Sequence, residues 1–327
     1  MKVNSANIRF WSRLGQRGSF FGIAMPDIAE KIEKIKLVTA DLAQLSGMDR
    51  FIKSHPDMFL NVGIAEQNMI GISAGLAMDG HCVFATTYAS FIAVRSLEHV
   101  RQHLAHMKCN IKVVGSAAGV IAAKTGVTHW ASEDLAFTRV LPNIQVLSAA
   151  DSLEAIKMAE YAASIDTPMY IRLSGGLNCP IVYNEDYEFI PGKFVELRKG
   201  SNIAVIATGL MVAESLKTAD ILAEKGINCS VYNMHTIKPI DKEKLKEIFA
   251  TNNLVVTVEE HNVLGGMGSA VAEYKATLSN TPKQLFSGIP DTYTKAGSQR
   301  YVWEQLGLTA VQIADKIQAE IVRKNNE

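Results

Sequence analysis

One glutamate stands where a carboxylate could act on a bound ligand. Residues 61–68 read Asn-Val-Gly-Ile-Ala-Glu-Gln-Asn, so Glu66 falls between an expected strand and an apolar helix. Parallel α/β sheets bind ligands at the carboxyl ends of their strands. Two interpretations are open: Glu66 is a first-turn carboxylate that the helix dipole favours, or a partly dehydrated carboxyl that shares a proton with a ligand nitrogen.

Two aromatic residues and a histidine follow other expected strands. Tyr88 and Phe91 lie three residues apart and could form one wall of a flat pocket, although aromatic residues near strand ends are usually core. His129 lies in a loop after a later strand. Imidazole titrates near neutral pH and therefore suits proton transfer, but a single loop histidine is more often a surface residue.

A further polar group lies much later in the chain. Residues 256–269 read Val-Thr-Val-Glu-Glu-His-Asn-Val-Leu-Gly-Gly-Met-Gly-Ser. This pattern predicts a strand, a carboxylate pair, a glycine turn and a helix. A metal site or a phosphate site would be consistent with it.

The elements that position these residues follow from an alternation that begins at Ile35. Short β-branched runs alternate with longer stretches of helical period, which is typical of βα units around a mostly parallel sheet. Several runs are apolar at consecutive positions, as strands buried on both faces are. The expected strands are Lys36–Ala40, Met58–Val62, Cys82–Thr86, Ile111–Gly115, Ile144–Ser148 and Met169–Leu173, and the expected helices are Gln67–Met78, Phe91–Met107 and Ser152–Ser164.

Residues 181–200 lack a sustained period and predict a linker over the surface. The alternation then resumes with expected strands Asn202–Thr208, Cys229–Met234 and Leu254–Val258 and expected helices Met211–Lys225, Gly268–Thr277 and Ala310–Arg323. The sequence thus predicts an α/β fold with two domains, each a mostly parallel sheet flanked by helices. The first spans 1–180 with an arm at 1–34, and the second spans 201–327.

Composition excludes some classes of partner. The 327 residues contain 33 basic and 33 acidic side chains, so no excess positive field would attract nucleic acid. The four cysteines lack metal-ligand spacing and indicate reduced thiols in a cytoplasmic protein. Neither a signal peptide nor a membrane-spanning run is expected.

The segment Gly-Ile-Ala-Glu-Gln-Asn resembles the pyrimidine-domain motif of transketolases and deoxyxylulose phosphate synthases. The resemblance implies thiamine diphosphate as cofactor, with Glu66 as the catalytic carboxylate. In that role Glu66 hydrogen-bonds the aminopyrimidine ring nitrogen and favours the imino tautomer, whose exocyclic nitrogen takes the thiazolium proton. The resemblance also implies that Tyr88 and Phe91 hold the aminopyrimidine by stacking and that Val94 completes the pocket.

Two shorter segments extend the resemblance. Thr-Ala-Asp-Leu at 39–42 resembles the family's Ala-Asp-Leu element, which implies that Asp41 and Leu42 approach the thiazolium ring. Lys-Thr-Gly-Val-Thr-His at 124–129 resembles the family's Asp-Gly-Pro-Thr-His, which implies that His129 contacts substrate hydroxyls. Thr125 takes the place of the family's aspartate, and its hydroxyl can still bond a sugar.

A second departure concerns the substrate's phosphate. At Ile-Arg-Leu-Ser-Gly, residues 171–175, many transketolases continue from serine into a phosphate-binding arginine, whereas this chain has Gly175. Arg172 lies three positions earlier, in a strand, and is the remaining candidate for a substrate contact. The missing clamp suggests a phosphate that is absent, displaced, or bound by a partner chain.

Residues 256–269 closely resemble the family's C-terminal-domain signature. In the family this segment is mainly architectural. The resemblance therefore implies that Glu259, Glu260 and His261 are non-catalytic.

Family enzymes anchor the diphosphate through Mg²⁺ in a separate domain that carries Gly-Asp-Gly and a later asparagine, and this sequence has no such triplet. The resemblance implies a partner subunit that ligates the Mg²⁺, while this chain supplies no metal ligand. With it the chain would form an α2β2 heterotetramer and move a two-carbon glycolaldehyde unit from a ketose to an aldehyde.

Three alternatives stay open. The chain could be the beta subunit of a 2-oxo acid dehydrogenase decarboxylase, although Thr128-His129 and the Glu-Glu-His segment look more like transketolase. It could also be a non-catalytic regulatory subunit, which Thr125 and Gly175 would fit but the retained Glu66 and His129 would not. Finally, the arm could contact a partner or simply pack on its own domain through its aromatic residues Phe10, Trp11, Phe20 and Phe21.

Overall fold

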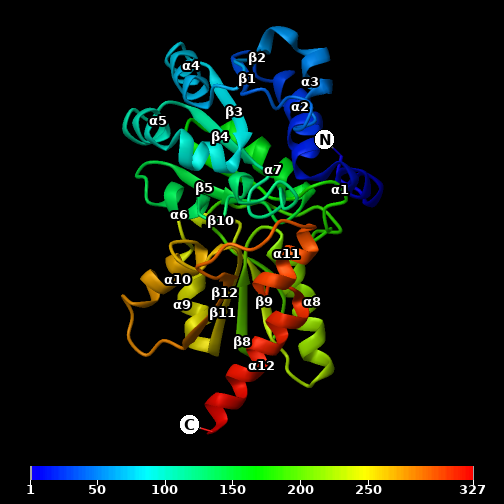
Figure 1. Cartoon of the computed structure of the whole chain (residues 1–327), viewed down its shortest axis with the longest axis vertical. Helices are drawn as coiled ribbons and strands as arrows, with labels where there is room; N and C mark the ends of the chain where they lie inside the picture. The colour runs from blue at the N-terminus through cyan, green and yellow to red at the C-terminus, as the bar shows by residue number, and fades with distance from the viewer. Residues whose placement is uncertain (1, 327) are drawn as a thin grey trace.

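The computed structural model describes residues 2–326. Two α/β domains lie end to end along the long axis of the molecule, with the N-terminal half at one end and the C-terminus at the other (Figure 1). This confirms the predicted fold class.

The first domain is built on a seven-stranded sheet. Every strand but one runs parallel to its neighbours, and the exception, β10, pairs antiparallel with β5 at one edge. In spatial order the strands are β10 (Thr236–Lys238), β5 (Gln145–Ser148), β6 (Met169–Leu173), β4 (Ile111–Ser116), β3 (Cys82–Tyr88), β1 (Ile35–Thr39) and β2 (Phe59–Asn61).

Helices cover both faces of this sheet. One face buries apolar side chains of α4, α6 and η4, and the other buries those of α1, η1, α2 and α7. The helices are α1 (Ser5–Ser19), η1 (Phe20–Ala24), α2 (Met25–Ala29), α3 (Asp49–Ser54), η2 (Pro56–Met58), α4 (Glu66–Met78), η3 (Phe91–Arg95), α5 (Leu97–Val100), η4 (Arg101–His106), η5 (Val127–His129), α6 (Asp134–Arg139) and α7 (Ser152–Ser164).

The second domain carries a five-stranded sheet, again mostly parallel. In spatial order its strands are β12 (Lys283–Ile289), β11 (Asn252–Asn262), β8 (Asn202–Ala207), β9 (Ser230–Asn233) and β7 (Val195–Arg198), of which β7 is antiparallel. Its helices are α8 (Met211–Glu224), α9 (Lys242–Thr251), α10 (Met267–Lys275), α11 (Gln299–Leu306) and α12 (Ala310–Asn326).

Several elements differ from those expected. The expected helix 91–107 is divided among η3, α5 and η4, whose first and last parts are wide π turns. Strand β7 lies inside the expected linker, because residues 195–198 pair with β9 of the second sheet. Strand β10 follows the expected border yet joins the first sheet. Elements α9, β12 and α11 were not expected at all.

The domains share one apolar core. A single cluster of buried side chains contains Val83 and Ile111 of the first sheet together with Ile206 and Val255 of the second. Met267 of α10 belongs to the same cluster. Because apolar burial is the main favourable term in folding, this continuity makes the two domains one packed body.

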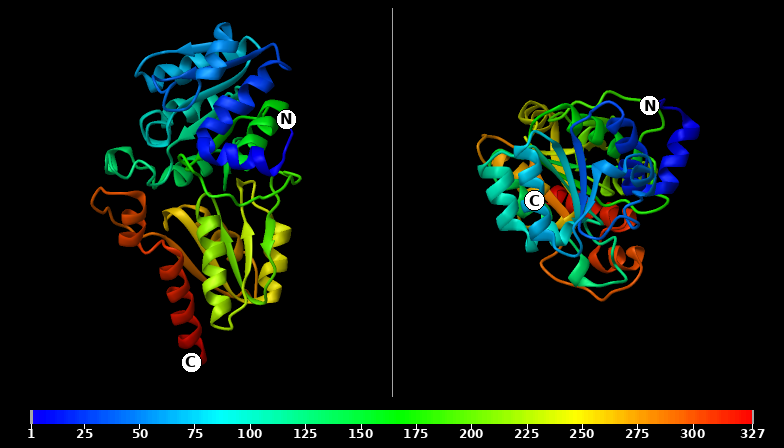
Figure 2. Two further views of the ribbon diagram at one scale, coloured as in Figure 1. Left: turned by 90° about the vertical axis from the view of Figure 1, so that its right-hand side faces the viewer. Right: turned by 90° about the horizontal axis from the view of Figure 1, so that it is seen from above.

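The N-terminal arm is a packed part of the first domain. Helix α1 lies against α7, and Figure 2 shows it beside the first sheet. Trp11, Phe20 and Phe21 are buried, whereas Phe10 is 46% exposed. Of the four aromatic residues considered for a partner contact, three therefore belong to the core.

Helix α1 also docks closely on the loop after β6. Gln16 accepts a hydrogen bond from the Gly175 N–H (2.7 Å) and donates its amide to the Ala149 carbonyl (2.8 Å). A Cβ on Gly175 would lie 2.7 Å from the Gln16 Cδ and 2.6 Å from the Cys179 Sγ. Glycine at this position is therefore what allows the helix to dock.

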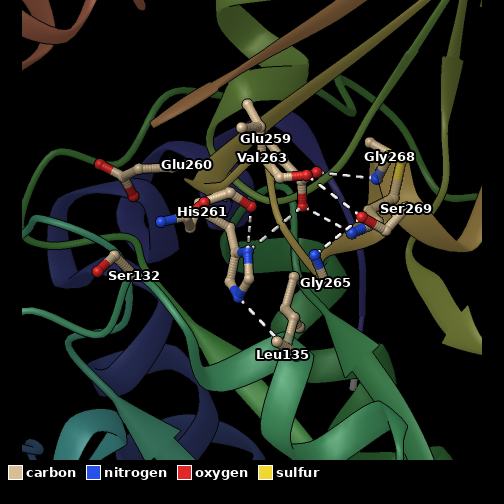
Figure 3. A network of polar contacts seen from close by, with 12 residues as sticks. Ser132, Leu135, Glu259, Glu260, His261, Val263, Gly265, Gly268 and Ser269 are labelled. Atoms are coloured by element: carbon tan, nitrogen blue, oxygen red, sulfur yellow. Dashed lines mark hydrogen bonds and ion pairs between the residues drawn. The ribbon is translucent and has the colours of Figure 1, made fainter. Parts of the chain in front are cut away.

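Two adjacent carboxylates of β11 point to opposite sides of the strand, as Figure 3 shows. Glu259 accepts hydrogen bonds from the N–H groups of Met267 (2.7 Å) and Gly268 (2.8 Å). His261 accepts the Ala136 N–H through Nε2 (3.3 Å), so its Nδ1 carries the proton and donates to the Asn262 carbonyl (2.7 Å). This side of the strand therefore joins α10 to α6.

Glu260 lies on the other side and is 1% exposed. Its Oε1 accepts hydrogen bonds from the Trp303 Nε1 (2.5 Å) and the Gln299 Nε2 (3.2 Å) of α11. Burial raises the pKa of Glu260 to about 7, although Arg172 and these donors act to lower it.

The docking of α1 predicts the effect of a small substitution. Gly175→Ala should lower the free energy of unfolding by about 1–3 kcal/mol, because the new methyl group overlaps Gln16 and Cys179. Gly75→Ala, in an exposed turn of α4 with open space around it, should instead stabilise by about 0.5–1 kcal/mol. Urea unfolding of both variants measures the difference, and an unchanged Gly175→Ala midpoint would contradict the docking.

Glu260 predicts a pH dependence of stability. Its folded pKa of about 7 exceeds the ordinary value of 4.5, so between these values the folded state holds a proton that the unfolded state releases. The stabilisation from this proton is complete below about pH 4.5 and is lost as pH rises through about 7, by up to about 1.4 kcal/mol per pH unit.

Glu260→Gln should therefore make the free energy of unfolding fall less steeply between pH 5 and pH 7. Denaturant unfolding at several pH values measures the slope. Glu243→Gln, at an exposed carboxylate of α9, should leave it unchanged. Equal slopes in the parent and Glu260→Gln chains would refute the expectation.

Candidate functional site

Three rings meet at the carboxyl edge of the first sheet. Tyr88 ends β3, Phe91 begins η3, and His129 ends η5 in the loop after β4. The ring centroids of Tyr88 and Phe91 are 5.6 Å apart, and each lies 5.4 Å from that of His129. All three pairs meet edge to face, a favourable arrangement for aromatic rings. The residues that the sequence singled out separately thus form one cluster.

Glu66 is the buried carboxylate of this edge. It is 3% exposed and begins α4, where the helix dipole favours negative charge. Its Oε2 accepts a hydrogen bond from the Arg95 Nη1 at 3.0 Å. The carboxylate is thus in the first turn of the helix and is also shielded from water, while proton sharing with a ligand nitrogen stays a prediction.

Arg95 is a site residue that sequence reasoning missed. Its guanidinium carbon lies 4.2 Å above the centre of the Phe91 ring, a cation–π contact, while Nη1 pairs with Glu66. The π turn of η3 closes from the Ser96 N–H to the Phe91 carbonyl (3.0 Å), and π turns are frequent at functional sites. The signal that the sequence offered for Arg95 was its position four residues after Phe91, an aromatic residue of the expected pocket.

Asp41 and Leu42 follow β1 at the same edge. Asp41 is exposed, with φ of +58°, and its carboxylate accepts the Asn61 side-chain N–H at 3.1 Å. Asn61 Oδ1 in turn accepts the N–H groups of Asp41 and Gly63, both at 3.0 Å. Asn61, which was not singled out from the sequence, therefore ties the Asp41 loop to the segment that leads into Glu66.

Two predicted residues lie at the rim of the site. Val94 is 54% exposed beside Arg95. Thr125 is exposed in the loop that ends with His129. The base of this loop is closed by two backbone hydrogen bonds between Gly119 and Ala131, of 3.1 and 2.9 Å.

Arg172 does not lie in the site. It is 1% exposed, and its Nε donates to the Asp134 Oδ2 at 2.8 Å. Its Nη2 donates to the carbonyls of Glu260 (2.8 Å) and Ala131 (3.3 Å). The predicted substrate contact of Arg172 is thus corrected, because these protein groups occupy the guanidinium at the domain interface.

A different arginine lies beside the loop that contains Gly175. A cavity of about 480 Å³ is lined by Arg17 and Leu14 of α1 and by Gly175 and Leu177. Burial lowers the pKa of Arg17, and nearby Tyr88 acts in the opposite direction. Arg17 received no role from the sequence, because only folding brings the arm to this edge.

The described residues contain no group of three or more His, Cys, Asp or Glu side chains placed to hold a metal ion. Over the same part of the chain, every helix is too short or too polar to cross a membrane. All four cysteines are free and buried.

Two family models match the chain in sequence. The model of the transketolase pyrimidine-binding domain covers residues 18–179, and that of the transketolase C-terminal domain covers residues 192–313.

Curated relatives match along most of their own length. A 6-deoxy-6-sulfo-D-fructose transketolase subunit of Clostridium sp. (strain MSTE9) is 36% identical over 91% of this chain and 92% of that protein. An apulose-4-phosphate transketolase subunit of Actinobacillus succinogenes is 37% identical over 85% of this chain and 89% of that protein.

Solved structures share the fold. A split-gene transketolase, described as an inactive beta4 tetramer, has a TM-score of 0.86 and 36% identity over 94% of this chain and 98% of that chain. Transketolase of Campylobacter jejuni, at 20% identity, has a TM-score of 0.76 over 94% of this chain and 46% of its own, which shows the fold alone. The chain therefore belongs to the transketolase family, as a split-transketolase-like subunit with pyrimidine-binding and C-terminal domains.

Proposed function

We propose that this chain is one half of a split transketolase that uses thiamine diphosphate and works with a diphosphate-binding partner. Together they transfer a two-carbon ketol (glycolaldehyde) unit from a ketose to an aldehyde acceptor. The observation that carries the proposal is the buried Glu66 carboxylate beside the cluster of Tyr88, Phe91 and His129. When bound, thiamine diphosphate supplies the carbon nucleophile for this transfer.

The site suits an aminopyrimidine ring. Phe91 and Tyr88 offer aromatic surface for a flat heterocycle, and Val94 lies at the rim of that surface. Glu66 accepts or shares a proton at a ring nitrogen, which its first-turn position and low exposure favour. Arg95 covers the Phe91 face and pairs with Glu66, so its side chain must leave when the ring enters.

Other residues serve the substrate and the rest of the cofactor. His129 holds and moves protons at the hydroxyl groups of the ketose, and Thr125 donates a hydrogen bond to the sugar. Asp41 and Leu42 border the thiazolium half of the cofactor. Arg17, in the cavity that contains Gly175, binds an anionic end of the ketose, which corresponds to a displaced phosphate site rather than an absent one.

The partner completes the site. It supplies the diphosphate half-site and most ligands of the Mg²⁺, which prefers oxygen donors and substrate phosphates. Two copies of each chain form an α2β2 assembly. Four unpaired, buried cysteines are compatible with a reducing, cytoplasmic setting.

Calorimetry with Mg²⁺ tests the division of the site. Thiamine diphosphate should bind tightly to a mixture of this chain with a diphosphate-binding subunit encoded beside it, and only weakly to this chain alone. The reason is that the lone chain offers contacts to the pyrimidine but none to the diphosphate. Tight binding by the lone chain would contradict the split site, and no binding in either case would favour a regulatory subunit.

The same mixture tests the catalytic carboxylate. Glu66→Gln keeps the shape of the side chain but cannot hold the charge, so turnover should fall by about 10²–10⁴-fold. Glu98→Gln, at an exposed carboxylate of α5, serves as the matched control and should turn over normally. Parent-like turnover by Glu66→Gln would remove Glu66 from the mechanism.

Arg17 predicts a selective loss of affinity for anionic substrates. Arg17→Met should lower kcat/KM about 10–100-fold for a ketose with a terminal phosphate, because one charge-assisted hydrogen bond is lost. A ketose that ends in a hydroxyl group should be unaffected. Arg13→Met, at an exposed position one turn earlier in α1, is the control. Equal losses for both ketoses would show that Arg17 does not contact the anion.

A further inference from the structure

The loop that carries His129 belongs to the first domain but packs into the second. Val120, Ala123 and Trp130 are buried in the apolar cluster that contains Val258 of β11 and Trp303 of α11. Trp130 directly follows His129. The second domain thus packs against this loop both before and after His129 in the chain.

Backbone contacts strengthen this hold. The Gly297 N–H, from the segment before α11, donates to the Ala123 carbonyl at 3.2 Å. The Asn262 N–H of β11 donates to the carbonyl of Ser132 at 2.7 Å, and Figure 3 shows Ser132 close to this network. Backbone hydrogen bonds therefore tie the loop to β11 and to the segment before α11.

Glu260 occupies the base of the loop. A Cβ built on Gly119 would lie 2.1 Å from the Glu260 Oε2, so this carboxylate oxygen is directly against the loop's first turn. Gly119 has φ of +66°, a left-handed conformation that glycine adopts without strain. The position of the carboxylate therefore fixes where Gly119 can lie.

Hydrogen bonds also join the two strands of chain at the base of this loop. Gly119 and Ala131 exchange two backbone hydrogen bonds, and Ala131 is two residues after His129. The Arg172 Nη2 donates to the carbonyls of both Ala131 and Glu260. Gly119, Ala131 and Glu260 are thus joined by direct contacts, two residues along the chain from His129.

We propose that Glu260 is a positioning residue, which sets the place of the His129 imidazole against Tyr88 and Phe91 by holding the Gly119–Ala131 base. The proposal rests on the function proposed above, in which His129 serves the substrate. It gives the C-terminal domain a part in the reaction, although the Glu260 side chain does not itself reach the site.

The placement of the imidazole can be read without any turnover. The His129 ring lies edge to face with two aromatic rings at 5.4 Å, so ring currents shift its NMR signals. In the full chain labelled at its histidines, with His129→Gln used for assignment, Glu260→Ala should move the His129 signal toward that of an unstacked imidazole. Trp303→Phe, which removes the donor to Oε1 but keeps a ring, should move it in the same direction.

Glu259→Gln is the matched control. Glu259 is the adjacent residue of β11 and is equally buried, but its carboxylate bonds Met267 and Gly268 and points away from the loop (Figure 3). It should leave the His129 signal in place. If Glu260→Ala does not fold, Trp303→Phe carries the test, because Glu260→Gln keeps the volume against Gly119 and should leave the His129 signal in place.

Kinetics of the chain assembled with its partner provide a second readout. Glu260→Ala should lower kcat by about 10–100-fold, the size of effect that a displacement of about 1 Å produces, with thiamine diphosphate affinity unchanged. In a His129→Ala background the same substitution should have no further effect on kcat, because both act through one group.

Two results would overturn the proposal: a His129 signal that stays at the parent position in the folded Glu260→Ala and Trp303→Phe chains, or an equal loss of kcat with and without His129. An assembled parent enzyme without ketol transfer would refute the proposed function instead. The NMR comparison would still decide whether Glu260 positions the imidazole.

Discussion

Arg172 brings a positive charge to the centre of the molecule, where Asp134 balances it at close range. Both side chains are essentially inaccessible to water, at 1% and 0% exposure. Removing one member of such a pair typically costs about 3–5 kcal/mol, because the other charge is left buried alone. The pair joins β6 to α6, and the Arg172 Nη2 hydrogens bond the loop base and the second domain. The sheet, the His129 loop and the domain interface therefore keep their relative positions through one guanidinium.

Most of the site could be predicted because parallel strands deliver their carboxyl ends to one edge. Glu66, Tyr88, Phe91 and His129 each lie at the end of a strand or soon after one, so the alternation of elements already predicted that they lie near one another. The buried strands could also be predicted from the sequence, because strands buried on both faces are apolar at consecutive positions.

The features that could not be predicted from the sequence depend on contacts between distant segments of the chain. Strands β7 and β10 have four and three residues and join sheet edges, where pairing partners rather than local patterns decide the structure. Arg172 was expected at the substrate because sequence distance says nothing about which side of a strand a long side chain takes. Arg17 and Arg95 were overlooked for the converse reason, since an arm and a π turn bring them to the site.

Gly175 shows how a departure from a family pattern can arise from packing. A side chain at this position is incompatible with the docked helix, since Gln16 fills the space that a larger residue would need. The same helix carries Arg17 to the adjoining cavity. Gly175 and Arg17 therefore line the same cavity, and the glycine is there because the helix that carries Arg17 packs against it.

Two features limit where this chain could be divided. The apolar core runs from Val83 of the first sheet to Val255 of the second, and strand β10 pairs with β5 of the first sheet. A polypeptide break between the two domains would leave each piece with half of a shared interior exposed to water. The first piece would also lack an edge strand, and bare sheet edges favour aggregation. A break between the two domains is therefore much more costly to stability than one placed outside the pair.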